Sequence, residues 1–311
     1  MQVAKALITA HLHHIVVEEL EQQGYQCEVR PSIEYEELLK IISEYEVLII
    51  RSRTKVNSEL LDTAKKLKFI GRAGSGMENI DQAYAAQKGI QCFNSPEGNK
   101  DAVAEHVIGM MLTLLHNIAK SDRALRKKNW QRKANTGTEL KGKTIGIIGY
   151  GNTGSALGEK LQAFGARLLV YDKYKMNFAN NFIEEVSLKR LQNEADVVSL
   201  HVPLTSETQY WVGANFINSF KKKIILINAS RGKVVQIQAL LQALDTGNIR
   251  AAGLDVFENE KMETFDSNDW AWYENLIERE NVILSPHIAG WSAESEYKIA
   301  YILSQKIKQS P

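Results

Sequence analysis

The segment Thr144-Ile-Gly-Ile-Ile-Gly-Tyr-Gly-Asn-Thr-Gly154 decides the fold of this 311-residue chain. Its first five residues are a short apolar run that predicts a buried strand. Gly149, Gly151 and Gly154 follow in the G-x-G-x-x-G spacing, and apolar residues at helical spacing come next. In a dinucleotide site, the first glycine permits the tight turn, the second lets a pyrophosphate approach the backbone, and the third lets the helix pack on the sheet. The N–H groups at the helix start then attract the phosphates.

An acid after the next predicted strand extends this motif. Residues 168–172 predict a second strand, and its last residue, Asp172, lies 18 residues after Gly154. A carboxylate at that point can accept hydrogen bonds from the adenosine ribose and repels a 2′-phosphate, so NAD is favoured over NADP. Glycines also serve simple turns, but strand, glycines, helix, strand and acid in this order indicate a dinucleotide-binding site.

The composition restricts the classes of partner. Lys plus Arg is 38 and Asp plus Glu is 37, and the net charge of +1 gives no general attraction to nucleic acid or anionic membrane. Neither a secretory signal nor an apolar run near the ~20 residues of a membrane span is visible. Cys27 and Cys92 form no C-x-x-C, so we expect free thiols in a reducing, cytoplasmic setting. His11, His13 and His14 lack a nearby acid or cysteine, so we expect no metal.

Strand-like and helix-like segments alternate along the chain, which predicts βαβ units, parallel sheets and the α/β class. The expected strands are Ala6–Thr9, Gln26–Val29, Val47–Ile50, Phe69–Arg72, Gln91–Phe93, Thr144–Ile148, Leu168–Asp172, Asp196–His201, Lys223–Asn228, Ala251–Val256 and Val282–Ser285. The longest expected helix is Asp101–Ile118, and Glu294–Lys308 is the last. The length suits about two domains, with ligands at the carboxyl ends of the strands.

Three features outside the expected strands are less specific. Arg123–Lys133 is basic and is expected to be a solvated arm. Trp270 and Trp272 are expected in a loop before the last strand, and His106 in the longest helix is expected to serve packing or the surface.

Several polar side chains follow predicted strands of the second half, where a site facing a cofactor is expected. They are His201, Arg231, Asp255, Glu260 and His287. An arginine can hold a carboxylate through two parallel hydrogen bonds. A histidine can carry a proton near neutral pH, and a neighbouring carboxylate orients it and stabilises its charged form. Singly, each residue could equally cap a loop, but the set suits hydride transfer at a carbon that bears a hydroxyl.

Eight segments in a fixed order carry a resemblance to a known family. They are Arg51–Val56, Gly71–Asp81, Trp130–Gly142, Gly146–Gly154, Ser199–Leu204, Asn228–Gly232, Gly253–Phe257 and Ser285–Gly290. On these segments the chain resembles the D-isomer-specific 2-hydroxyacid dehydrogenase family over nearly its whole length, and within it the phosphoglycerate dehydrogenases most.

The resemblance implies roles for individual residues. Arg231 would bind the carboxylate and carbonyl of the substrate, His287 would be the acid/base, and Glu260 would support His287. Contacts to NAD would come from Ser75, Gly149, Gly151, Asn152, Thr153, Gly154, Asp172, His201, Val202, Pro203, Ala229, Ser230, Asp255 and Gly290. Contacts to the substrate would come from Arg51, Ser52, Arg72, Gly74, Ser75 and Gly76, and from Arg132 of a neighbouring subunit. Arg51 and Arg72 would serve a substrate phosphate.

The resemblance also implies how the chain is divided. A Rossmann NAD domain, residues 100–285, would be inserted in a flavodoxin-like substrate domain made of residues 1–99 and 286–311. The arm to Leu140 would carry the contact of a homodimer or tetramer. Two departures from the family pattern are Lys261, where proline is common, and Trp291, which stands in a small-residue segment and is expected to reshape the substrate pocket. A regulatory domain of the longer enzymes is not expected after Pro311.

These features predict an NAD-dependent oxidoreductase that transfers a hydride between C2 of a D-2-hydroxyacid and NAD. The first expectation is 3-phospho-D-glycerate to 3-phosphohydroxypyruvate, a step of serine biosynthesis. A reductase of hydroxypyruvate, glyoxylate or another 2-oxoacid is the close alternative. An NAD(H)-sensing, corepressor-like binding protein is the alternative of another class, because such proteins keep the same residues.

Overall fold

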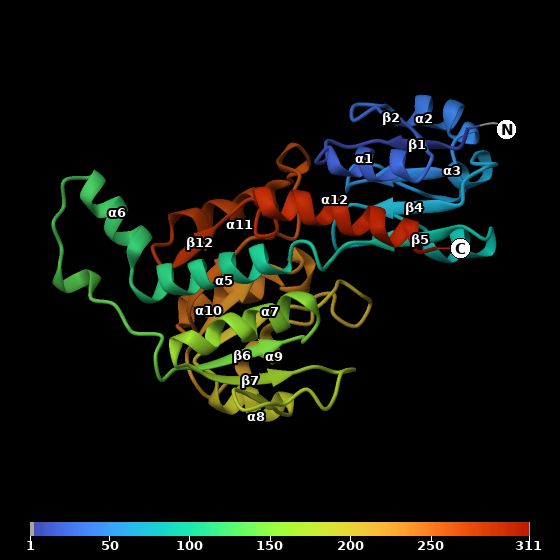
Figure 1. Ribbon diagram of the computed structural model, residues 1–311. Coiled ribbons are helices and arrows are strands. Elements are labelled where there is room, and N and C mark those ends of the chain that lie inside the picture. Colours follow the sequence, from blue (N-terminus) through green and yellow to red (C-terminus); the bar gives the residue numbers. More distant parts are fainter. Residues whose placement is uncertain (1–2, 311) are drawn as a thin grey trace. The chain divides into compact units, whose positions relative to one another are not determined.

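The computed structural model describes residues 3–310, and the chain folds into two compact units. Unit 1 holds the residues through Lys100 together with those from Trp291 onward, and unit 2 is Asp101–Gly290. Each unit contains a parallel sheet with helices packed against it (Figure 1). The predicted α/β class with two doubly wound sheets is confirmed.

Unit 1 contains a five-stranded sheet in the order β2-β1-β3-β4-β5, the order of flavodoxin-like folds. Its strands are β1 (Lys5–Ile8), β2 (Gln26–Val29), β3 (Val47–Ile50), β4 (Phe69–Arg72) and β5 (Gln91–Asn94). Its helices are α1 (Ile15–Gln22), α2 (Tyr35–Ile41), α3 (Ser58–Thr63), α4 (Gln82–Gln87) and α12 (Ala293–Lys308). All four residues of β3 are buried, as expected for a central strand covered on both faces. Ile299 and Leu303 bring α12 into the core on one face of this sheet.

Unit 2 contains a seven-stranded parallel sheet in the order β12-β11-β10-β9-β6-β7-β8. Its strands are β6 (Thr144–Ile148), β7 (Arg167–Tyr171), β8 (Ile183–Glu185), β9 (Val197–Leu200), β10 (Ile224–Asn228), β11 (Ile249–Leu254) and β12 (Val282–Leu284). Its helices are α5 (Lys100–Leu115), α6 (Ile118–Arg126), α7 (Asn152–Leu161), α8 (Leu188–Glu194), α9 (Ala214–Asn218), α10 (Ile237–Thr246) and α11 (Ser267–Glu278). The strand order reverses between β6 and β9, which is where such sheets bind ligands.

Two expectations from the sequence are wrong. The long helix does not continue to Ile118, because Asn117 adopts a left-handed φ of 54° and the chain bends by 62° into α6. Trp270 and Trp272 do not lie in a loop but in α11. There the carboxylate of Asp266 accepts hydrogen bonds from backbone N–H groups, and with Asp269 it forms a capping box that starts the helix.

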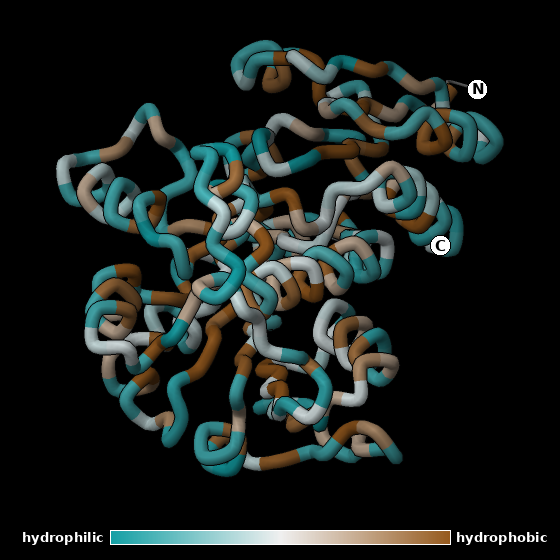
Figure 2. The backbone as a smooth tube through the Cα atoms, turned by 90° about the vertical axis from the view of Figure 1, so that its left-hand side faces the viewer, coloured by the Kyte–Doolittle hydropathy of each residue, from teal (hydrophilic) through white to brown (hydrophobic). Residues whose placement is uncertain are grey.

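The hydropathy of the chain follows this architecture. Hydrophobic segments run through the interior of each unit, and hydrophilic residues dominate the connecting loops (Figure 2). No single helix within residues 3–310 is long and apolar enough to cross a membrane, although the bent pair α5–α6 passes that test by length and composition. Eight residues of α5 are buried inside the structure.

Candidate functional site

The glycine loop of unit 2 makes the turn from β6 into α7. Gly149 has a φ of +94°, and a Cβ there would lie 2.4 Å from the carbonyl oxygen of His201. A Cβ on Gly154 would lie 2.0 Å from the carbonyl oxygen of Gly149. A Cβ on Gly151 would meet no atom within 4 Å, and Gly151 gives α7 no side-chain cap. Gly151 and Asn152 are exposed, so the start of α7 is accessible, and this loop fits a pyrophosphate.

His201 supports this loop from the end of β9. Its Nδ1 lies 3.0 Å from Oγ1 of Thr153, and its Nε2 lies 2.9 Å from Oγ of Ser199. Burial lowers the pKa of His201 to about 4, so the ring is neutral at neutral pH. We infer that His201 holds the first turn of α7 through Thr153. Val202 and Pro203 follow it, half-buried and exposed respectively.

Asp172 follows β7 directly, and backbone N–H groups hold its carboxylate. It accepts hydrogen bonds from the N–H groups of Tyr150 at 2.7 Å, Tyr174 at 2.8 Å and Lys175 at 2.9 Å. Burial acts to raise the pKa of Asp172, but these three donors and the Lys175 ammonium bring it below its ordinary value. An ionised acid at this position suits ribose hydroxyls and repels a 2′-phosphate.

Two glycine variants should separate folding from cofactor binding. Gly154→Ala is expected to destabilise unit 2 by about 1–3 kcal/mol, because its methyl group has only backbone to displace. Gly151→Ala is expected to keep the melting temperature and to weaken NADH binding by about tenfold, or ~1.4 kcal/mol, by blocking the approach of the phosphates. Thermal unfolding and NADH fluorescence titration measure the two effects. Equal changes in melting temperature would contradict this assignment.

The candidate catalytic residues lie in the segments that follow three neighbouring strands, at the carboxyl edge of the sheet. Arg231 follows β10, Glu260 follows β11, and His287 follows β12. The register pairs Asn228 with Leu254 and Leu254 with Leu284, so the three strands end at the same level. A Cβ on Gly232 would lie 1.5 Å from the carbonyl oxygen of Phe257, and the loops after β10 and β11 therefore pack backbone against backbone.

His287 and Glu260 form a pair. The distance from Nδ1 of His287 to Oε2 of Glu260 is 2.8 Å, and 47% and 40% of the two side chains are exposed. This contact orients the ring and leaves Nε2 on its opposite side for a reactant. Arg231 donates a hydrogen bond from Nη1 to the carbonyl oxygen of Ser230 at 2.7 Å. Ser230 and its neighbour Ala229 belong to a turn that Asn228 fixes by accepting from the N–H and Oγ of Ser230.

Asp255 fixes the loop that carries His287. Its side chain is buried, and it accepts hydrogen bonds from the N–H of Ile288 at 2.9 Å, the N–H of Ala289 at 2.8 Å and Oγ of Ser285 at 2.5 Å. The N–H of His287 itself donates to the Asp255 carbonyl at 2.7 Å. His287 has a φ of +55°, a strained conformation for a non-glycine residue, and these bonds hold it there. A contact of Asp255 with the cofactor stays a prediction.

His106 takes part in the same network, which the sequence did not indicate. Its Nε2 lies 2.9 Å from Oγ of Ser285 and 3.6 Å from Oδ1 of Asp255. These residues are far apart in the chain, and no local pattern marks their contact. Gly290 follows the loop and is half-buried.

The candidate substrate residues of unit 1 lie at the carboxyl edge of its sheet. Arg51 follows β3 and Arg72 ends β4, and the register pairs Ile50 with Arg72. The loop with Gly74, Ser75 and Gly76 follows β4 directly.

Asn94 at the end of β5 and Asn99 beyond it hold this loop. The amide of Asn94 donates to the Ser75 carbonyl at 2.6 Å, and Ser75 Oγ donates to Asn99 at 3.0 Å. Ser52 is exposed, and so is Arg132 on the arm of unit 2. The structure thus gathers the candidate substrate residues of unit 1 at one edge of its sheet; their contact with a substrate stays a prediction.

Comparison with known proteins agrees with this geometry. Residues 108–289 match the family model described as D-isomer specific 2-hydroxyacid dehydrogenase, NAD binding domain. The chain belongs to this family. The similarity extends well beyond unit 2. A D-3-phosphoglycerate dehydrogenase of Archaeoglobus fulgidus is 34% identical to this chain over 305 residues, or 97% of this chain. The chain spans only 56% of the length of that relative.

Two further members of the dehydrogenase family are matched along most of their own length. A hydroxypyruvate reductase of Thermotoga maritima is 38% identical over 275 residues, which is 88% of this chain and 88% of the relative. The crystal structure of a D-lactate dehydrogenase from Aquifex aeolicus with NAD and lactic acid superimposes with a TM-score of 0.84 at 28% identity, covering 98% of this chain and 94% of that one.

Proposed function

We propose that the chain is an NAD-dependent D-2-hydroxyacid dehydrogenase. Its preferred substrate in this proposal is 3-phospho-D-glycerate, which it converts to 3-phosphohydroxypyruvate, as in serine biosynthesis. The observation that carries the proposal is the 2.8 Å pair of His287 and Glu260, at the same sheet edge as Arg231 and in the unit with the glycine loop. The family membership of the chain supports the reaction class.

The side chains divide the work of this reaction. Bound NAD supplies the hydride acceptor, and in the reduced form the donor. Arg231 holds the substrate carboxylate and polarises the carbonyl oxygen at C2. His287 takes the hydroxyl proton at Nε2 during oxidation and returns it during reduction. Glu260 stabilises the imidazolium that forms. Asp255 keeps the loop of His287 in place throughout.

The substrate phosphate is assigned to Arg51 and Arg72 on unit 1. Their positions at the ends of the neighbouring strands β3 and β4 support this, as do the phosphoglycerate dehydrogenase names among the relatives. The alternative, a hydroxypyruvate reductase, is favoured by the Thermotoga relative, which matches along 88% of its own length.

A substrate panel tests the choice between these two acids. NADH absorbance is followed with 3-phospho-D-glycerate in the presence of a product trap, and with 3-phosphohydroxypyruvate, hydroxypyruvate and glyoxylate in reverse. A higher kcat/KM for the phosphorylated acid supports the proposal. Activity on the unphosphorylated acids alone keeps the mechanism and rejects the substrate.

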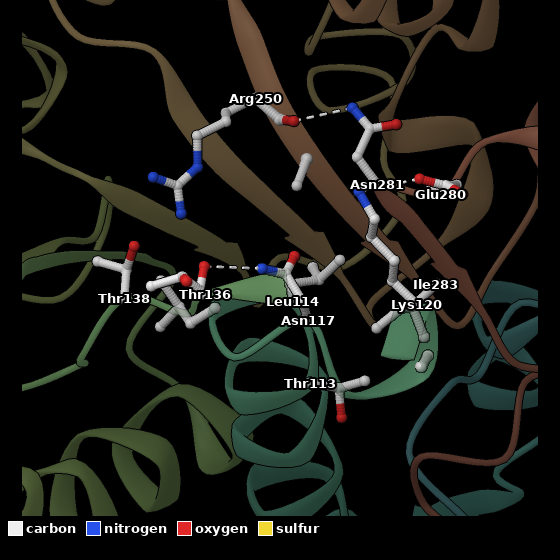
Figure 3. Close-up of a pocket in the computed structure, with 13 residues that line it drawn as sticks. Thr113, Leu114, Asn117, Lys120, Thr136, Thr138, Arg250, Glu280, Asn281 and Ile283 are labelled. Carbon is white, nitrogen blue, oxygen red and sulfur yellow. Dashed lines mark hydrogen bonds and ion pairs between the residues drawn. The ribbon is translucent and has the colours of Figure 1, made fainter. Parts of the chain in front are cut away.

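We also propose a homodimer built on the arm from Ile118 to Leu140. None of the nine residues of α6 is buried, and Ile118, Leu125 and Trp130 are 54%, 52% and 76% exposed. The arm stands away from the rest of unit 2 in Figure 1. Beside its base lies a cavity of about 320 Å³ (Figure 3). Its wall includes Lys120, which pairs with Glu280 at 3.0 Å, and the exposed Arg250.

A charge placed on the apolar face of α6 should dissociate this dimer. Leu125→Glu is expected to halve the mass found by light scattering at micromolar concentration, because a buried unpaired carboxylate is costly at an interface. Met262→Glu is the matched control, since Met262 is a similarly exposed apolar residue of unit 2 outside the arm, at 47%. A mass that Leu125→Glu leaves unchanged would reject the arm as the interface.

We also propose a cytoplasmic location, because both cysteines are free, as is usual in a reducing compartment. Cys27 and Cys92 are both free thiols. Burial raises the pKa of each thiol to about 11, so both are thiols rather than reactive thiolates at neutral pH.

A further inference from the structure

Arg51 of unit 1 is held between an aromatic ring and a carboxylate. Its guanidinium carbon lies 4.7 Å from the centroid of the Trp291 ring. Its Nη1 lies 3.9 Å from Oε1 of Glu296. Only 21% of the Arg51 side chain is exposed, compared with 45% of Glu296. The arginine assigned to the substrate phosphate is therefore already engaged by two side chains of the same unit.

The start of α12 fixes both partners of Arg51. Ser292 is the N-cap, and its side chain accepts from the N–H of Ser295 at 3.0 Å while Ser295 Oγ accepts from the N–H of Ser292 at 2.8 Å. This capping box holds Trp291, the residue just before it, and Glu296 in the first turn. The positive end of the helix dipole also attracts the negative charge of Glu296 to this turn.

The two partners act on Arg51 in different ways. The face of the Trp291 ring holds the guanidinium through a cation–π contact but leaves N–H donors of Arg51 able to bind a phosphate. The carboxylate of Glu296 competes with a phosphate for those donors and repels it. A hydroxyl group at the same place has no charge to repel and can donate a hydrogen bond to the carboxylate. Trp291 therefore favours a phosphate at C3 of the substrate, and Glu296 opposes it.

We propose that Trp291 and Glu296 are specificity-determining residues that set how strongly the Arg51 guanidinium prefers a phosphorylated over an unphosphorylated 2-oxoacid. This inference rests on the proposed dehydrogenase function. It assigns the choice between the two candidate substrates to residues around Arg51 and not to Arg51 and Arg72 alone. Trp291 is 62% exposed, so its replacement leaves the core of unit 1 intact.

The experiment compares two acids that differ only in the phosphate. Initial rates of NADH oxidation give kcat/KM for 3-phosphohydroxypyruvate and for hydroxypyruvate. Glu296→Gln is expected to raise the ratio of the two values by about three- to tenfold at low salt, and the gain should shrink as salt screens the charge. Trp291→Ala is expected to lower the ratio several-fold, and Trp291→Phe to restore most of it.

Glu294→Gln is the matched control. Glu294 lies in the same first turn and carries the same charge, so this variant alters the helix end without removing the partner of Arg51. Inorganic phosphate, as an inhibitor of hydroxypyruvate reduction, gives a second readout: Glu296→Gln should lower its inhibition constant. Equal ratios in all variants, or equal gains from Glu294→Gln and Glu296→Gln, would overturn the inference. Absence of turnover with both acids in the unaltered protein would instead contradict the proposed function.

Discussion

Replacing His287 with glutamine is expected to lower kcat for reduction of the 2-oxoacid by about 10²- to 10⁴-fold. Glutamine keeps an amide that can contact Glu260 but has no group that exchanges a proton near neutral pH. NADH binding should stay nearly unchanged, because the residues proposed to hold the cofactor, the glycine loop and Asp172, lie at the ends of β6 and β7 and are not altered. Steady-state rates and NADH fluorescence titration measure the two properties on one preparation.

Glu260→Gln refines the same prediction. Its distance of 2.8 Å from His287 gives the imidazolium a charged partner, which the amide removes. The rate of reduction is expected to fall less than in His287→Gln, because the histidine that transfers the proton is still present. Substantial turnover by His287→Gln would show that another group transfers the proton.

Replacing Arg231 with alanine is the second change of large effect. It is expected to lower kcat/KM by about 10³-fold, since a charged, bidentate contact to the carboxylate is worth several kcal/mol in a desolvated site. Arg231→Lys should recover only part of the loss, because an ammonium cannot reproduce the planar pair of donors. Lys233→Ala is the matched control: it removes the same charge from the same loop, at an exposed position.

The saturation behaviour of the Arg231 variants identifies the contact. A raised KM with an unchanged kcat would mean that Arg231 binds substrate and transition state alike. A lowered kcat would mean that Arg231 also stabilises charge on the reacting carbonyl in the transition state. Equal losses in Arg231→Ala and Lys233→Ala would reject a specific contact and leave only a general effect of charge.

The sequence predicts those parts of the fold that short segments determine. Thr144–Ile148 and Gly149 to Gly154 are eleven consecutive residues. Strand, loop and helix start therefore follow from local spacing alone. The strand β3 is a run of four buried apolar residues and was equally predictable. By contrast, the break at Asn117 depends on one residue in a left-handed conformation inside an otherwise continuous helical pattern.

The candidate site shows the same division between local and long-range information. His287, Glu260 and Arg231 could be named from motifs that each span a few residues. The contacts that support them could not. Hydrogen bonds and a 3.6 Å contact between His106 and Asp255 join Ser285, Asp255 and His106, which come from α5 and from the segments after β11 and β12. The engagement of Arg51 by Glu296 likewise joins β3 to the last helix.

The rate and the chirality of product formation from 3-phosphohydroxypyruvate and NADH test the central claim most directly. The mechanism predicts stoichiometric oxidation of NADH, formation of the D-hydroxyacid alone, and loss of this activity in His287→Gln with NADH binding retained. Tight NADH binding without turnover of any 2-oxoacid, or formation of the L-hydroxyacid, would contradict it.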